Sequence, residues 1–129
     1  MKIDPELLRG LIRIALIAKD EGYLHEAESI FEVASIFRPD SAYPCIGKAE
    51  VLMHKGLLEK AVTTLRNAPI KNLKEQELCH CYLGRALKLS GYYEEAQKIL
   101  KEIKNNGTYD LSKRFAKELY EADFSVFFR

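Results

Sequence analysis

Cys79, His80 and Cys81 are the residues whose types come closest to a chemical site, because thiolates and imidazole are ligands of zinc. Successive residues of a helix differ by about 100° in direction, so Cys79 and Cys81 would point to well-separated sides. A four-ligand zinc site would also need a second pair of ligands, and the chain offers none at a matching spacing. We interpret both cysteines as small apolar side chains that fill helix contacts, and we expect no metal and no cofactor.

Other signals of catalysis are missing from the sequence. His25 and His54 stand near predicted turns, where we expect them to be solvated. The chain contains no glycine-rich phosphate loop, no nucleophilic serine elbow and no separated pair of carboxylates. We therefore expect a protein that is not an enzyme.

Composition narrows the class of partner. The 129 residues carry 20 Lys and Arg against 19 Asp and Glu, a net charge of +1, which argues against nucleic acid as the partner. The most apolar stretch, 7–18, is interrupted by Arg9, Gly10 and Arg13 and is too short to span a membrane. It lacks a signal-peptide cleavage site, and the 3 cysteines form no disulfide framework. These features predict a cytoplasmic location, without membrane contact.

An internal repeat organises the chain. Segments 20–32, 54–66 and 89–101 each contain a glycine, then an aromatic residue or leucine, then an alanine five residues after the glycine. A glycine ends a helix by adopting a left-handed conformation, and an alanine lets two antiparallel helices approach closely. The repeat therefore predicts helical hairpins, with the repeating glycines and alanines at Gly22, Gly56, Gly91, Ala27, Ala61 and Ala96.

The start and stop signals place seven helices. Asp4 and Pro5 begin the first one, Pro39 ends the second, and Asn105, Asn106 and Gly107 end the sixth, with Asp110 as the expected cap of the last. The predicted ranges are 5–21, 24–37, 42–55, 58–67, 75–90, 93–105 and 111–127.

The spacing of about 34 residues and the small and apolar positions resemble the tetratricopeptide repeat. The resemblance implies a single all-α domain, 1–129, in which three helical hairpins form a right-handed superhelix that is followed by a C-terminal capping helix. The repeats would cover about 8–41, 42–75 and 77–110, and the last helix about 111–127. Lys48 departs from the usual leucine, and Pro69 displaces the end of the second repeat.

The last helix carries two apolar stripes. One has helical spacing and should pack on the third repeat; it consists of Leu111, Phe115, Leu119, Ala122 and Val126. The other either curls over the core or joins a partner surface, including that of a homodimer. It consists of Tyr120, Phe124, Phe127 and Phe128.

The resemblance also implies a concave groove lined by the first helix of each repeat. The residues at its groove-facing positions, with one neighbour, are Arg9, Ile12, Leu16, Lys19, Asp20, Tyr43, Ile46, Glu50, Met53, His54, Leu78, Cys81, Tyr82, Arg85, Lys88 and Leu89. Some of them would instead belong to the core of the stack.

One tetratricopeptide subclass grips acidic C-terminal tails through a carboxylate clamp. The clamp positions here hold no lysine or arginine, so we exclude that mode; they are Ile12, Leu16, Gly47, Leu78 and Tyr82. An apolar floor with Arg9, Arg85 and Lys88 at its margins suits an amphipathic helix or an extended apolar segment of another protein.

The short repeat array, and the run 37–65 in particular, resembles the chaperones of bacterial type III secretion, first the co-chaperone of the needle subunit and next the translocator chaperones. The resemblance implies a groove that sequesters a helix of a self-assembling client, with a second small chaperone as a further partner. The alternative is a scaffold or regulatory adaptor with no secreted client. In either case we expect Ile12→Asp or Ile46→Asp to abolish partner binding while leaving the helices intact.

Overall fold

The computed structural model describes residues 3–124, which form an all-α fold, as the sequence predicts. The helices are α1 (Pro5–Asp20), α2 (Leu24–Phe37), α3 (Ala42–His54), α4 (Leu58–Arg66), α5 (Leu73–Leu89), α6 (Tyr93–Asn106) and α7 (Asp110–Glu121). This part of the chain contains no strand. None of these helices is long and apolar enough to cross a membrane.

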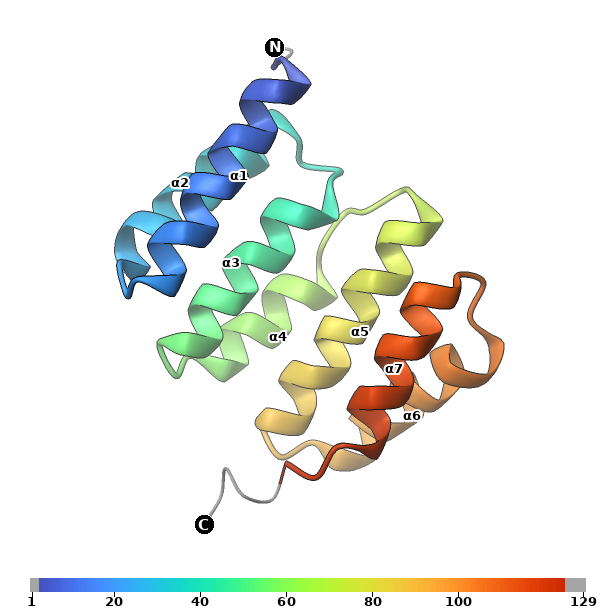
Figure 1. Cartoon of the computed structure of the whole chain (residues 1–129). Helices are drawn as coiled ribbons and strands as arrows, with labels where there is room; N and C mark the ends of the chain where they lie inside the picture. The colour runs from blue at the N-terminus through green and yellow to red at the C-terminus, as the bar shows by residue number, and fades with distance from the viewer. Residues whose placement is uncertain (1–2, 125–129) are drawn as a thin grey trace.

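The helices form two layers. Each helix packs against the next one in sequence, and α1 also contacts α3, α3 contacts α5, and α5 contacts α7. Figure 1 shows these four odd-numbered helices as one row, with α2, α4 and α6 behind them. The row of odd-numbered helices is therefore one continuous face, built from segments far apart in sequence.

The repeating glycines end the first helix of each hairpin, as predicted. Gly22, Gly56 and Gly91 have φ angles of 88°, 79° and 88°, and they are the only described residues with positive φ. The residue after each glycine donates its backbone N–H to a carbonyl one turn and a half back, such as Tyr23 N to Ala18 O at 2.8 Å. This hydrogen bond ends the helix and requires a left-handed backbone at the glycine. Other residues disfavour that conformation because they carry a Cβ atom.

Small residues let the helices approach closely. Ala27, Ala61 and Ala96 are each fully buried, as expected for the start of the second helix of each hairpin. A Cβ atom added to Gly47 on α3 would lie 2.2 Å from the ring of Phe31 on α2. The Phe31 ring thus occupies the space directly above the α3 backbone, and the close packing of α2 on α3 depends on the missing side chain.

Two glutamates of α5 accept hydrogen bonds from the backbone at or just before the N-termini of α3 and α7. Glu75 accepts a hydrogen bond from the backbone N–H of Ala42 at 2.9 Å, and Glu77 accepts one from that of Thr108 at 2.7 Å. The prediction that Asp110 caps α7 is therefore wrong: Glu77 binds the backbone just before α7, and no side chain caps the helix locally. The Asp4 cap is confirmed, since its carboxylate accepts from Glu6 N at 2.8 Å.

Helix α7 ends at Glu121, so the predicted extension to residue 127 is wrong. The Lys88 ammonium donates hydrogen bonds to the carbonyls of Leu119, Tyr120 and Ala122 at 2.6, 3.1 and 2.8 Å. These are carbonyls at a helix end, which cations stabilise. The backbone becomes extended at Ala122, and Phe124 then packs into the core. Val126, Phe127 and Phe128 lie outside the described residues.

Candidate functional site: a cavity along the odd-numbered helices

A cavity of about 440 Å³ lies along the row of odd-numbered helices, with one contribution from α2. Its volume falls in the range of ligand and side-chain pockets. Eight of its twelve lining residues have aliphatic or aromatic side chains. The lining residues are Ile12, Leu16, Lys19, Phe31, Tyr43, Ile46, Gly47, Glu50, Tyr82, Arg85, Phe115 and Leu119.

Many of the predicted groove residues come together at this cavity. The predicted groove residues that line it are Ile12, Leu16, Lys19, Tyr43, Ile46, Glu50, Tyr82 and Arg85. Phe115 and Leu119 were expected to pack on the third repeat, and they also reach the cavity from α7. The sequence showed the apolar stripe that contains both residues, but it did not indicate that α7 would extend the same face.

Other predicted groove residues lie elsewhere. Arg9 is exposed and pairs with Glu6 on its own helix, while Met53 and Leu78 pack against the core. Cys81 is fully buried and Lys88 is only 2% exposed, so the prediction that they face the groove is wrong. Both residues point to α7, which covers this side of α5.

The walls of the cavity are aromatic and aliphatic side chains that remain accessible. Leu16 is 39% exposed and Tyr43 is 52% exposed, although both line the cavity. On the opposite wall, the rings of Tyr82 and Phe115 pack edge to face, with 5.1 Å between centroids and an interplanar angle of 65°. Burial raises the pKa of Tyr82, so its hydroxyl is neutral at physiological pH. The arrangement offers apolar contact area to a visiting side chain.

One carboxylate pairs with both cations of the cavity. Glu50 on α3 pairs with Arg85 of α5, and its second oxygen lies 3.9 Å from the Lys19 ammonium of α1. The side chains of Glu50 and Lys19 are 14% and 15% exposed. Three odd-numbered helices are thus joined by one charged cluster, and neither cation is left without a negative partner.

Removing the Glu50 charge should destabilise the fold. In Glu50→Gln, Arg85 would lose its carboxylate partner, and Lys19 would keep only its 3.9 Å contact with Asp20. We expect the free energy of unfolding, measured in urea, to fall by about 1–3 kcal/mol. The matched control is Glu32→Gln, which breaks the pair with Lys48, a 2.8 Å contact whose glutamate is 54% exposed. That change should alter stability by less than about 0.5 kcal/mol, and equal losses in both variants would contradict the assignment.

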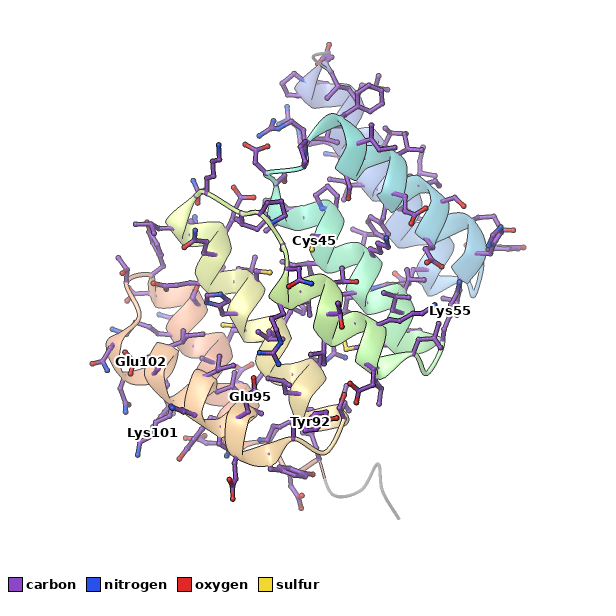
Figure 2. All side chains as sticks on the ribbon, turned by 180° about the vertical axis from the view of Figure 1, so that it is seen from behind. Cys45, Lys55, Tyr92, Glu95, Lys101 and Glu102 are labelled. Carbon is purple, nitrogen blue, oxygen red and sulfur yellow. The ribbon has the colours of Figure 1, made fainter. Side chains whose placement is uncertain are left out.

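A second hollow of about 570 Å³ lies between α2, α3 and α4. Its walls carry the ion pairs Glu28–Lys55 and Glu32–Lys48. Figure 2 views the molecule from behind and labels Lys55. A hydrogen bond from Lys55 lowers the pKa of Glu28. Four of the six charged side chains of this hollow are paired with one another, so the apolar cavity along the odd-numbered helices is the stronger candidate site.

Two aromatic residues of the predicted second stripe, Tyr120 and Phe124, lie within the described residues and pack against the core. Phe124 is 8% exposed and packs with Cys81, Leu100 and Leu119. Tyr120 is half-buried against the same cluster. The interpretation of Phe124 as part of an exposed second interface is therefore wrong, and the alternative that the chain end covers the core holds for this residue.

Leu111 departs from the prediction in the opposite sense. It was expected to pack on the third repeat, but it is 66% exposed. Ser112 is the buried residue of that turn, and its carbonyl accepts a hydrogen bond from the Cys81 thiol at 3.4 Å. The start of α7 therefore turns a different face to α5 than the apolar pattern suggested.

The cysteines and histidines form no metal site in residues 3–124, where no three His, Cys, Asp or Glu side chains are grouped suitably. Cys79 and Cys81 are 2% and 0% exposed and belong to different core clusters. His80, between them, is exposed. The two thiols fill helix contacts on separate sides of α5, as their spacing predicts.

Comparisons of the chain with protein-family models, with curated proteins and with solved structures return no match. The function must therefore be inferred from the site itself.

Proposed function

We propose that the chain is a protein-binding chaperone whose cavity along α1, α3, α5 and α7 receives an apolar segment of another polypeptide. The observation that carries this proposal is the accessible apolar lining of the cavity, including Leu16 and Tyr43. A solvent-exposed apolar hollow on a rigid helical face is typical of surfaces that bind a partner helix or strand.

The charges of the cavity support an apolar guest. Lys19 and Arg85 both face Glu50, so a carboxylate from a partner would have to compete with a charge already in place. An aliphatic or aromatic side chain meets no such competition. Fully burying one such side chain contributes about 1.5–3 kcal/mol before the ordering of the partner is subtracted.

The resemblance to tetratricopeptide proteins and to type III secretion chaperones supports the more specific form of the proposal. In that form the repeats are tetratricopeptide hairpins in a right-handed superhelix, and the guest is an amphipathic helix of a self-assembling secreted subunit. The mechanism is competition. A subunit that polymerises through an apolar helix remains monomeric while the chaperone covers that helix.

A charge inside the cavity should weaken binding of the partner strongly. We expect Leu16→Asp to weaken retention of the partner by tenfold or more, because an aspartate would have to be desolvated under the guest. The measurement is affinity purification of the tagged chain from cells that express it, followed by mass spectrometry. Ile17→Asp is the matched control: Ile17 is the next residue, is 58% exposed and does not line the cavity. Loss of the same partner in both variants, or in neither, would overturn the proposal.

Leu16→Asp is a better test of partner binding than Ile46→Asp. Ile46 lines the cavity, but it is only 8% exposed and belongs to the central core cluster. An aspartate at Ile46 would therefore unfold the chain as well as block the cavity, contrary to the expectation of intact helices. Leu16 separates the two effects because it is accessible.

A further inference from the structure

Cys45 and Cys79 meet at the junction of three helices. The Cys45 thiol, on α3, donates a hydrogen bond to the carbonyl of Thr64 at 3.5 Å, and the Cys79 thiol, on α5, donates one to the carbonyl of Leu65 at 3.7 Å. Thr64 and Leu65 are consecutive residues of α4. The two sulfur atoms are therefore held against adjacent peptide groups, although their residues are far apart in sequence.

The two thiols differ in accessibility. Cys45 is partly exposed, whereas Cys79 is 2% exposed and packs in the core. Cys45 is labelled in Figure 2, on the side of the molecule that carries α4. A small oxidant can thus reach Cys45 more readily than Cys79.

The thiols also perturb one another. The neighbouring Cys79 thiol lowers the pKa of Cys45, and the nearby Lys48 ammonium acts in the same direction. The neighbouring Cys45 thiol, together with burial, raises the pKa of Cys79. A more acidic, more accessible thiol next to a second thiol is the arrangement found in oxidisable cysteine pairs.

We propose that Cys45 and Cys79 are a peroxide-oxidisable dithiol that closes to a disulfide between α3 and α5. The Cys45 thiolate attacks one oxygen of hydrogen peroxide, the O–O bond breaks, and the departing hydroxide takes up a proton to become water. The Cys79 sulfur then attacks the Cys45 sulfenic acid, the S–O bond breaks, and a second water leaves with the Cys79 proton. Two thiols and one peroxide give one disulfide and two waters.

The disulfide would join α3 and α5, which together supply six of the twelve residues that line the cavity. Residues 46 and 50 of α3 and residues 82 and 85 of α5 line it. A covalent bond between these helices fixes their separation and restricts the unfolded chain. Oxidation should therefore raise the Tm of the protein, and this expectation does not depend on the proposed partner.

The test uses the full chain, reduced and freed of reductant, then treated with hydrogen peroxide. Unreacted thiols are alkylated in denaturant, and the peptides are mapped without reduction. We expect an intramolecular Cys45–Cys79 peptide pair, an intact mass lower by two hydrogen atoms, a higher Tm, and complete reversal by dithiothreitol. Cys81→Ala should retain the bond, and Cys45→Ala should lose it, with circular dichroism showing that both variants fold.

Two results would overturn the proposal. One is a bond that involves Cys81 or a second copy of the chain. The other is oxidation of Cys45 to sulfinic acid in the wild type without any link to Cys79. Either result can be read from the wild-type peptide map alone, so it stands even if a variant folds poorly.

Discussion

Lys88→Met is expected to lower the free energy of unfolding by about 3 kcal/mol, a large fraction of the stability of a domain of this size. Methionine keeps most of the buried stem but removes the ammonium that donates to the carbonyls of Leu119, Tyr120 and Ala122. Burial lowers the pKa of Lys88, and the charge of Asp123 acts against this shift. Urea unfolding measures the loss, and hydrogen exchange should show the end of α7 opening first.

The matched control is Lys104→Met. The Lys104 ammonium lies 5.0 Å from the ring centroid of Tyr120, and within residues 3–124 it donates no hydrogen bond to a helix end. A contact of this kind is worth about 0.5–1 kcal/mol. If Lys88→Met were no more damaging than Lys104→Met, the account of how α7 ends would be wrong.

Gly47→Ala should be the most damaging single methyl addition on the odd-numbered helices. The new Cβ atom would lie 2.2 Å from Cε1 and 2.4 Å from Cζ of Phe31, a side chain that is fully buried and cannot move aside. Overpacking of this kind destabilises by about 1–3 kcal/mol. We expect a loss near the upper end of that range in urea unfolding, together with a weaker partner interaction, since Gly47 and Phe31 both line the cavity.

Gly10→Ala provides the opposite expectation on a neighbouring helix. A Cβ atom at Gly10 meets nothing within 4 Å, and the residue lies inside α1. Alanine should therefore stabilise the helix by about 0.5–1 kcal/mol. If the free energy of unfolding changed in the same direction in Gly47→Ala and Gly10→Ala, the described packing of α2 on α3 would be contradicted.

The hairpins could be predicted because their determinants are local. Gly22, Gly56 and Gly91 end helices through backbone conformation alone, and the alanine that follows each one is selected by the contact of two adjacent helices. Neither signal requires knowledge of the rest of the fold. The helix bounds deduced from them agree with the structure to within about two residues, except in the last helix.

The last helix shows where local signals fail. An apolar pattern continues through residue 126, but α7 ends at Glu121 because Lys88, one helix pair earlier in sequence, binds its final carbonyls. No spacing within residues 110–128 encodes a donor that comes from α5. The repeat pattern assigned Lys88 to the groove because it contains no information about the contact of this residue with α7.

The candidate site could be predicted only in part. Leu16 and Tyr43 follow from helical phase, because groove-facing positions recur along the odd-numbered helices. Phe115 required knowing that α7 lies beside α5. The repeat pattern also placed Cys81 on the groove face. Helix α7 covers Cys81, so the burial of this residue is a consequence of tertiary packing.

The binding of another polypeptide in the cavity can be tested by site-specific photo-crosslinking at Tyr43. A benzophenone-bearing phenylalanine analogue at this position replaces one exposed aromatic side chain with another inside the cavity, whereas the same analogue at Tyr23, which is 57% exposed, lies outside it. After illumination of cells that express the chain, mass spectrometry identifies the linked peptides. We expect position 43, and not position 23, to capture a discrete polypeptide through a segment with apolar residues at helical spacing. Capture of the same polypeptide from position 23 alone, or of none from position 43, would contradict the assignment of the cavity as the binding site.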